Sequence, residues 1–570
     1  MALRIWHTHS LLLICAFTAG CGAKNQTNTE WDAFAKRYIE AYFAARPDVA
    51  VVEGRHEFDG KLPDFSPAAL DREIARLHAA RDRAQKFQEG SLDRRQRFER
   101  DYLIWAIDND LFWRESVRWA YKNPYFYNDA IDPEVYLTRP YAPLNVRMKA
   151  FIDYERALPR VLEQIRDNLQ ITRPLPRTYV ERGRELFGGM AQYFEKDVPG
   201  IFSPAPDPAL KTAFEGANGF AVRALKALDR WFELQENDAT GSFALGPEKF
   251  DEMVRTTERV NLPFERLEAI GREDLERNLA ALRDACAQFA PGKSTEACVA
   301  KANADKPQKN PVETARQQVK DLTGFVSTQK LASIPGTEEA QVDLAPPYQR
   351  WNFAYINIPG PYEKNMPAVY YIAPPDPKWP RAEQEAYLPG KDDLLFTTAH
   401  EVMPGHFLQF LHANRAASPI GRIFGSYAFV EGWAHYAEEM IWDAGLGGGD
   451  PEVHIGQLTN ALLRDVRFLS AIGLHVRGMS VQDSERMFRE SAFQDAGNAR
   501  QQAARGTFDP AYLNYTLGKL MIRKLRDDWT GSRGGKAAWG QFHDEFLSYG
   551  APPIPLVRTA MLGSSAGPPL

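Results

Sequence analysis

Apolar residues recur at helical spacing along most of this chain. Trp31, Phe34 and Tyr38 are three or four residues apart, as they would be on one face of an α-helix. The same period continues to about Phe289 and returns after Asp392. This pattern predicts helices over most of the sequence.

Two segments have the pattern of strands instead. Residues 351–358 and 368–372 are rich in aromatic and β-branched side chains and are bounded by Pro-Gly or Pro-Pro. We expect a small antiparallel sheet, whose edge could accept an extended peptide as an added strand or whose role could be simple support. Because helical segments dominate, the predicted fold is mainly α, with one helical domain over residues 29–570 that could form two lobes around a cleft.

The first residues have the pattern of an export signal. The apolar run at residues 10–17 is too short to span a bilayer but suits the core of a signal peptide. The following T-A-G-C resembles the lipobox of bacterial lipoproteins, although a threonine stands where leucine is usual. We expect residues 1–20 to be removed, Cys21 to be lipidated, and residues 21–28 to form a polar tether. The protein would then be exported and anchored at a membrane facing the periplasm, with the outer membrane as one option.

Composition narrows the choice of partners. The chain has 570 residues, of which 44% are hydrophobic and 25% charged, and its formal net charge is −6. Such a chain can bury a large core, and its acidic and basic residues are interleaved. We therefore expect no nucleic-acid partner, and no membrane contact beyond the lipid anchor. The sequence does not encode the oligomeric state.

Two cysteines remain in the expected mature domain. Cys286 and Cys298 flank a Pro-Gly-Lys-Ser turn. In an oxidising periplasm we expect them to pair, and closing a loop of this size would stabilise the fold by roughly 3 kcal/mol. A redox or metal role is disfavoured, because no second cysteine pair is present.

The candidate chemistry begins with the segment H-E-V-M-P-G-H, which runs from His400 to His406. In the common H-E-x-x-H motif, one helical turn brings both histidines onto one face. Here they are six residues apart, so an unbroken helix would rotate His406 by roughly 120° away from His400. Pro404 and Gly405 can deform the helix, because proline removes a backbone donor and glycine tolerates unusual dihedrals. We predict a kink or bulge there, which would allow both rings to share one Zn²⁺ ion per chain.

A carboxylate would complete the ligand set, because two imidazoles and one carboxylate can hold Zn²⁺ in three of four tetrahedral positions. The segment E-G-W-A-H-Y-A-E offers four candidates: Glu431, His435, Glu438 and Glu439. Glu431 and Glu438 are roughly 10 Å apart along a helix, so they cannot both reach one ion. We favour Glu431, because Gly432 and Ala434 allow another helix to approach closely. Glu401 would then be the general base.

These segments resemble a bacterial family catalogued as domain of unknown function 885, whose members are often lipoproteins and are grouped with gluzincin-type zinc metallopeptidases. The family signature H-E-x-x-P-G-H is matched at residues 400–406, and E-G-W-A-x-Y-x-E at residues 431–438. The second segment is also similar to N-E-G-F-A-x-Y-x-E of aminopeptidase N-like enzymes, in which the first glutamate is a zinc ligand. The resemblance covers the whole exported part. It implies a large helical gluzincin-like metallopeptidase scaffold with His400, His406 and Glu431 as metal ligands.

The resemblance implies further site residues. Gluzincins use a tyrosine or histidine to hold the tetrahedral intermediate, which makes Tyr515 and His475 candidates, with packing as the alternative role of each. Arg467 matches a family arginine and could bind a substrate carboxylate or form a structural ion pair. Ala471 and Ala511 stand where the family usually has an aspartate and a glutamine, so substrate specificity could differ.

We therefore expect a zinc-dependent hydrolase of peptide bonds, in which metal-activated water attacks the carbonyl and Glu401 transfers the proton. One alternative is an amidohydrolase that acts on a non-peptide amide. Another is a non-catalytic, peptide-binding lipoprotein whose metal is structural, which a fourth protein ligand would favour. The sequence does not indicate the identity or length of the substrate.

Overall fold

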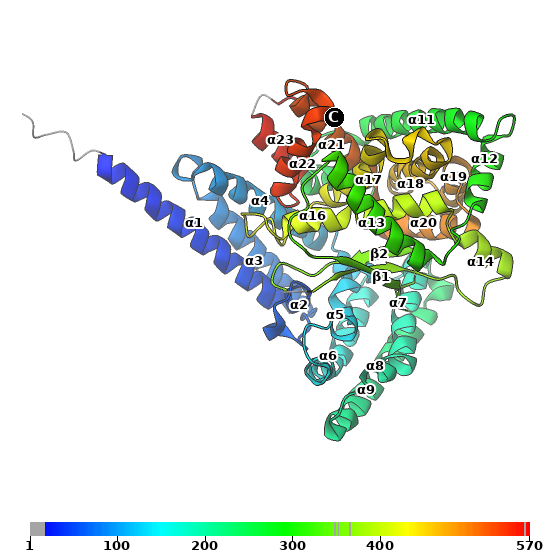
Figure 1. Cartoon of the computed structure of the whole chain (residues 1–570). Coiled ribbons are helices and arrows are strands. Elements are labelled where there is room, and N and C mark those ends of the chain that lie inside the picture. The colour runs from blue at the N-terminus through cyan, green and yellow to red at the C-terminus, as the bar shows by residue number, and fades with distance from the viewer. Residues whose placement is uncertain (1–16, 347–348, 351–352, 364–365, 564–565) are drawn as a thin grey trace, which may run out of the picture.

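The computed structural model describes residues 17–346, 349–350, 353–363, 366–563 and 566–570, with side chains from residue 29 onward, and is mainly helical (Figure 1). Most of the expected signal peptide and the side chain of Cys21 lie outside the described residues. Helix α1 (Phe17–Ala45) includes residues 21–28, so the segment expected to be a tether is helical. None of the helices in the described ranges combines the length and hydrophobicity needed to span a membrane.

The N-terminal helices pack around an aromatic core. They are α1, α2 (Pro47–Val52), α3 (Pro67–Gln85) and α4 (Arg94–Leu111). Trp31 is fully buried in this core, and its indole N–H donates to Glu99 at 3.0 Å. Ile420 and, from the other end of the chain, Leu556 pack into the same core. The two ends of the sequence are thereby joined in one body.

A helical arm follows and has a hydrophobic core of its own. It consists of α5 (Glu134–Thr138), α6 (Leu144–Gln170), α7 (Arg177–Lys196), α8 (Val198–Phe202) and α9 (Pro208–Glu233). In Figure 1, α8 and α9 extend away from the sheet.

The rest of the chain shares one large core. Its first helices are α10 (Pro247–Thr257), α11 (Phe264–Phe289), α12 (Thr295–Ala304), α13 (Pro311–Gln329), α14 (Arg381–Tyr387), α15 (Lys391–Glu401) and α16 (His406–Ala413). The later ones are α17 (Tyr427–Asp443), α18 (Pro451–His475), α19 (Val481–Ser491), α20 (Ala496–Phe508), α21 (Asn514–Thr530), α22 (Trp539–Ser548) and α23 (Ile554–Leu562). Helix α18 is central, because it contacts α11, α15, α17, α19, α20 and α21. Cys286 and Cys298 form a disulfide that joins α11 to α12.

The small sheet is mixed, not antiparallel as expected. Strand β2 (Ala354–Asn357) pairs antiparallel with β3 (Ala368–Ile372), whereas β1 (Ala340–Leu344) pairs parallel with the other side of β3. The expectation missed β1. Its five residues A-Q-V-D-L do alternate between apolar and polar side chains, but they include one β-branched residue and no aromatic residue, and only Val342 is buried. Residues 351–352 of the predicted strand lie outside the described ranges. The sheet contacts α13 through β1 and α15 through β2, so it supports the helix that carries His400.

Candidate metal centre

The H-E-V-M-P-G-H segment forms the end of one helix and the start of another. Helix α15 ends at Glu401, and α16 begins at His406. A Cβ atom on Gly405 would lie 1.7 Å from the carbonyl oxygen of His400, so only glycine fits at this turn. The two imidazole rings meet at 85° with centroids 4.8 Å apart. The structure thus has the predicted break, and the break turns His406 toward His400.

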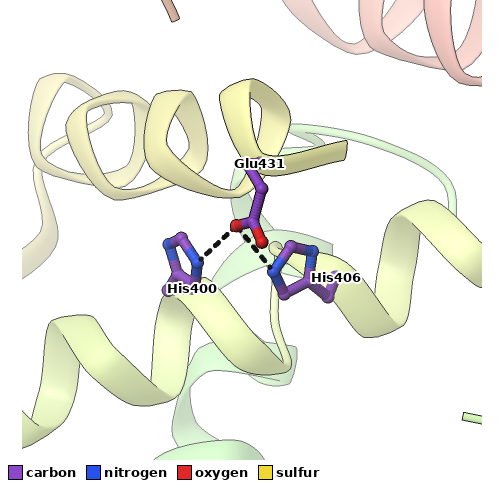
Figure 2. Close-up of side chains that lie close together, drawn as sticks. All are labelled: His400, His406 and Glu431. Carbon is purple, nitrogen blue, oxygen red and sulfur yellow. Dashed lines mark ion pairs between the residues drawn. The ribbon is translucent and has the colours of Figure 1, made fainter. Parts of the chain in front are cut away.

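Glu431 reaches the two histidines from α17 (Figure 2). Its Oε2 lies 3.3 Å from Nε2 of His400 and 3.3 Å from Nε2 of His406. The neighbouring Gly432 packs on Gly518 of α21, where an added Cβ would lie 2.4 Å from the Cα atom of Gly518. The close packing of α17 on α21 therefore depends on glycine at both positions, and it fixes the backbone that carries Glu431.

These three side chains fit a divalent cation. One ligand atom from each lies within 4.8 Å of the other two, and no other such group occurs among the described residues. Ligand atoms bound to tetrahedral zinc at about 2.0–2.1 Å are about 3.4 Å apart, which matches the separations around Glu431. Its Oε2 is buried and has no hydrogen-bond partner within the described ranges. Two imidazole nitrogens and one carboxylate oxygen form a donor set suited to zinc.

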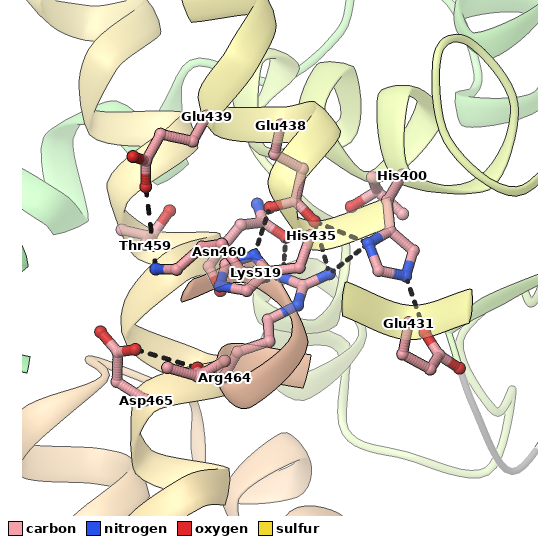
Figure 3. A network of polar contacts seen from close by, with 12 residues as sticks. His400, Glu431, His435, Glu438, Glu439, Thr459, Asn460, Arg464, Asp465 and Lys519 are labelled. Atoms are coloured by element: carbon pink, nitrogen blue, oxygen red, sulfur yellow. Dashed lines mark hydrogen bonds and ion pairs between the residues drawn. The ribbon is translucent and has the colours of Figure 1, made fainter. Parts of the chain in front are cut away.

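A second layer of side chains orients His400 (Figure 3). Nδ1 of His400 lies 2.7 Å from Oε1 of the fully buried Glu438, and Arg464 donates to the same oxygen at 3.1 Å. Burial raises the pKa of Glu438, but Arg464 and His400 lower it well below its usual value, so the group is a carboxylate. An imidazole that donates from Nδ1 presents the lone pair of Nε2 to the cluster. Nδ1 of His406 is buried and has no such partner among the described residues.

The other two candidates for the third ligand face away from the cluster. Nδ1 of the fully buried His435 lies 3.6 Å from Oε2 of Glu438, and burial lowers the pKa of His435 to about 4. Glu439 instead accepts hydrogen bonds from Arg277 and Arg523, each at 3.0 Å. Of the four candidates, only Glu431 contacts both histidines.

Electrostatics in the cluster favour the charged forms of His400 and Glu431. Burial alone would lower the pKa of His400, but its contacts with Glu431 and Glu438 raise it to about 9. Burial would likewise raise the pKa of Glu431, but His406 and His400 hold it well below its usual range. A histidine of raised pKa must lose a proton before it can bind a metal ion.

Glu401 and Tyr515 line a cavity of about 1180 Å³ that reaches His400. The lining residues lie between positions 296 and 515, so the helical arm does not contribute to the cavity. The cavity lies within the unit built on the large core, and the possible division into two lobes around a cleft stays a prediction. Burial raises the pKa of Glu401, and His406 and His400 only partly offset the increase. This carboxylate is therefore a stronger base than an exposed glutamate.

Tyr515 faces the cluster and retains a proton that it can donate. Its ring centroid lies 6.1 Å from that of His400, at an interplanar angle of 20°. Its hydroxyl accepts a hydrogen bond from Arg505 at 3.2 Å. Burial raises the pKa of Tyr515, so the hydroxyl is protonated near neutral pH. The O–H can therefore donate into the cavity, as a group that stabilises an oxyanion must.

Sequence reasoning missed Arg505, which holds this part of the site together. It donates to the hydroxyls of Tyr427 and Tyr515 and forms an ion pair with Asp509 at 3.0 Å. The available signal was the four-residue spacing of Arg505 and Asp509 on a helix. That spacing is common on helix surfaces and indicates no chemistry by itself.

His475 lies away from the cavity, which corrects its assignment as an oxyanion group. Its Nε2 lies 2.7 Å from the carbonyl oxygen of Gly506, and its Nδ1 accepts from the amide of Leu245 at 3.3 Å. Because both nitrogens are engaged, His475 links the end of α18 to α20 and to the chain before α10. Ala471 and Ala511 are buried in the large core and do not line the cavity.

Arg467 lines the cavity beside Tyr515. Its guanidinium carbon lies 4.7 Å from the centre of the Tyr515 ring, and its Nε donates to Gln502 at 2.8 Å. Within the described ranges, no acidic side chain forms an ion pair with it. The expectation of a structural ion pair is therefore not met.

The fold and the site define a class: a mainly helical protein with a candidate cation site of two histidines and one glutamate. The chain belongs to the family described as "Bacterial protein of unknown function (DUF885)", which it matches over residues 47–561. The comparison with curated proteins found no match to this chain.

Two solved structures have the same fold. One is a candidate lipoprotein of unknown function from Shewanella oneidensis, at 21% identity and a TM-score of 0.76, with 93% of this chain and 99% of that chain covered. The other is a candidate lipoprotein from Colwellia psychrerythraea, at 17% identity and a TM-score of 0.78, with 94% and 98% covered. At these identities the likeness extends to the fold alone.

Proposed function

We propose that this protein is a zinc-dependent hydrolase of peptide bonds. The observation that carries the proposal is the convergence of His400, His406 and Glu431 in one cluster, which meets a cavity lined by His400 and Glu401. A Zn²⁺ ion held by these three side chains would supply a Lewis acid for a carbonyl group and for water.

The roles of the surrounding residues follow from their environments. Glu401, whose pKa is raised by burial, can accept a proton and later release it to a leaving amine. The Tyr515 hydroxyl can donate to an oxygen that gains negative charge. Glu438 holds His400 in the tautomer that exposes its Nε2.

The number of ligands supports catalysis over a purely structural role for the metal. Structural zinc sites have four protein ligands, whereas catalytic sites have three and an open position. The described residues offer three at this centre, and Glu438 lies behind His400 instead of completing the set. The proposal therefore favours an enzyme over a peptide-binding lipoprotein.

We also propose that the protein is an exported lipoprotein anchored through Cys21 and facing the periplasm. The names of the two solved structures support this proposal, together with the lipobox-like residues of the sequence. We expect Cys21→Ala to move the protein from the membrane fraction to the soluble fraction. Unchanged membrane association in that variant would contradict the lipid anchor.

Zinc titration combined with a substrate panel tests the hydrolase. We expect the protein, after removal of metal by a chelator, to bind one equivalent of zinc and to cleave peptides only when zinc is restored. His406→Ala should abolish both, whereas His454→Ala, at a histidine that stacks on Trp442 outside the cluster, should change neither. Cleavage of acylated amines but not peptides would favour a non-peptide amide substrate. Zinc binding without hydrolysis of either class would overturn the proposed activity.

A further inference from the structure

We propose that Arg467 forms a carboxylate-binding subsite beside the metal centre, so that the substrates are peptides or N-acyl amino acids with a carboxylate close to the scissile bond. This inference rests on the proposed hydrolase function and specifies its substrate class. It follows from a contrast between two arginines on one face of α18.

Arg464 and Arg467 lie one turn apart on α18, and both line the cavity. Arg464 is neutralised inside the protein, because it donates to Glu438 at 3.1 Å and to the side-chain oxygen of Asn460 at 2.6 Å (Figure 3). Arg467 has no acidic partner among the described residues. On this helix face, Arg464 is therefore paired within the protein, whereas Arg467 is available to a ligand.

The surroundings of Arg467 suit an anion. The residue is only 6% exposed, and its single side-chain hydrogen bond in the described structure runs from Nε to Gln502. Its two terminal nitrogens have no hydrogen-bond partner among the described residues, and the residue lines the cavity. A charge removed from water without a counter-ion is unfavourable, and a bound anion would offset that cost. The guanidinium fork matches the two oxygens of a carboxylate.

The neighbouring groups leave this positive charge uncompensated. Arg505 is neutralised by Asp509, and within the described ranges the side chain of Arg467 contacts the neutral side chain of Gln502 and the ring of Tyr515. Desolvation by burial lowers the pKa of Arg467 to about 10, which still leaves it positively charged near neutral pH. An approaching carboxylate would meet a cation that the protein itself does not pair.

The position of the subsite limits the substrate. The Arg467 guanidinium lies 4.7 Å from the centre of the Tyr515 ring, and that ring lies 6.1 Å from the ring of His400. A carboxylate held by Arg467 is therefore separated from the metal centre by little more than one aromatic ring. Such a short span favours a carboxylate within one or two residues of the scissile carbonyl. Either a chain terminus or an acidic side chain could supply it.

Matched substrates on the zinc-loaded full-length protein test the subsite. We expect KM for N-acetyl-Ala-Ala to be at least about tenfold lower than KM for the same compound with a C-terminal amide, as expected when a buried cation loses its counter-ion. N-acetyl-Ala-Glu amide distinguishes a chain terminus from an acidic side chain as the source of the carboxylate. A low KM for this compound would assign the subsite to an acidic side chain. Equal KM values for all three compounds would overturn the inference.

Variants link the preference to Arg467. We expect Arg467→Gln to raise KM for the free acid by on the order of 10², with kcat and zinc content little changed and the amide unaffected. Arg467→Lys should restore part of the preference. Arg489→Gln, at an exposed arginine on the same cavity, removes the same charge and should leave the preference intact. Equal losses in Arg467→Gln and Arg489→Gln would indicate a general effect of net charge and overturn the subsite.

Failure of the hydrolase proposal can be told apart from failure of the subsite. Calorimetric titration of zinc-loaded Glu401→Gln with N-acetyl-Ala-Ala measures binding without turnover. Binding of the acid that Arg467→Gln abolishes would support the subsite even if no substrate is cleaved. No difference between acid and amide in this titration would overturn the subsite while leaving hydrolysis a separate question.

Discussion

Oε1 of Glu438 lies 2.7 Å from Nδ1 of His400, and Oε2 of Glu431 lies 3.3 Å from Nε2 of the same ring. One imidazole is thus held between two carboxylates that come from a single helix, α17. The two glutamates are seven residues apart, so one faces the cation position and the other supports the ring from behind. This arrangement divides their roles between ligand and support.

Glu438→Gln should weaken zinc binding without removing a ligand. Loss of the charged partner of a metal-bound histidine commonly lowers metal affinity by about 10- to 100-fold. We expect an effect of this size in a competitive chelator titration, with the stoichiometry still one ion per chain. Glu439→Gln is the matched control, because Glu439 is paired with Arg277 and Arg523 and does not contact His400. Equal weakening in both variants would indicate a general loss of packing.

Glu401→Gln should separate metal binding from catalysis. Glu401 lies beside His400 but is not one of the three clustered ligands, so the variant should retain one equivalent of zinc. Removal of a general base usually lowers the rate by about 10²- to 10⁴-fold. We expect kcat to fall by this factor in a steady-state assay. Full activity in a zinc-loaded variant would rule out Glu401 as the base.

Tyr515→Phe should lower kcat while leaving zinc content unchanged. The variant keeps the ring that packs beside His400 and Arg467 but removes its hydroxyl group. Loss of one donor to an oxyanion usually costs about 10² to 10³ in kcat. Tyr427→Phe is the control, because the Tyr427 hydroxyl donates to Asp509. A similar fall in both variants would show that the Arg505 network matters as a whole and that Tyr515 has no special role.

His475→Ala should affect stability more than activity. Both ring nitrogens are engaged with backbone groups, so the variant leaves buried polar groups without partners. We expect a loss of about 1–3 kcal/mol in the free energy of unfolding, measured with urea, and little change in kcat/KM. A large fall in kcat with unchanged stability would return His475 to the list of catalytic groups.

The local parts of the site were predictable because short motifs determine them. The six-residue spacing of His400 and His406 requires a break, and Pro404-Gly405 is the place where the helix can break. Glycine beside Glu431 predicted close helix packing, which the structure shows as the contact of Gly432 with Gly518. In both cases the signal lies within a few residues of the feature that it determines.

The missed parts depend on contacts between distant segments. Arg464 supports His400 from a position 64 residues away, and no periodicity links the two. His475 matched a family position. It lies at the C-terminal end of the long helix α18, however, outside the cavity that Arg464 and Arg467 line. Strand β1 pairs in parallel with β3, a partner that its own short sequence does not indicate. Such relationships arise from tertiary packing, which a local pattern does not encode.

The pH dependence of stability should differ between zinc-loaded protein and protein stripped of metal by a chelator. Contacts with Glu431 and Glu438 outweigh the effect of burial and raise the pKa of His400 from 6.5 to about 9. A group whose pKa is raised by folding stabilises the fold below its unfolded pKa, and the contribution is lost as pH rises through the folded pKa. We therefore expect the stripped protein to lose unfolding free energy, on the order of 3 kcal/mol, as the pH rises from about 6.5 to about 9.

Zinc should remove this dependence, because it binds the neutral imidazole and replaces the proton. We expect zinc binding near pH 7 to release about one proton from His400, measured by calorimetry in buffers of different ionisation enthalpy. His400→Gln should lose both the proton release and the decline in stability. Zinc binding without proton release, or an equal decline with zinc bound, would mean that the ion does not occupy the cluster of His400, His406 and Glu431.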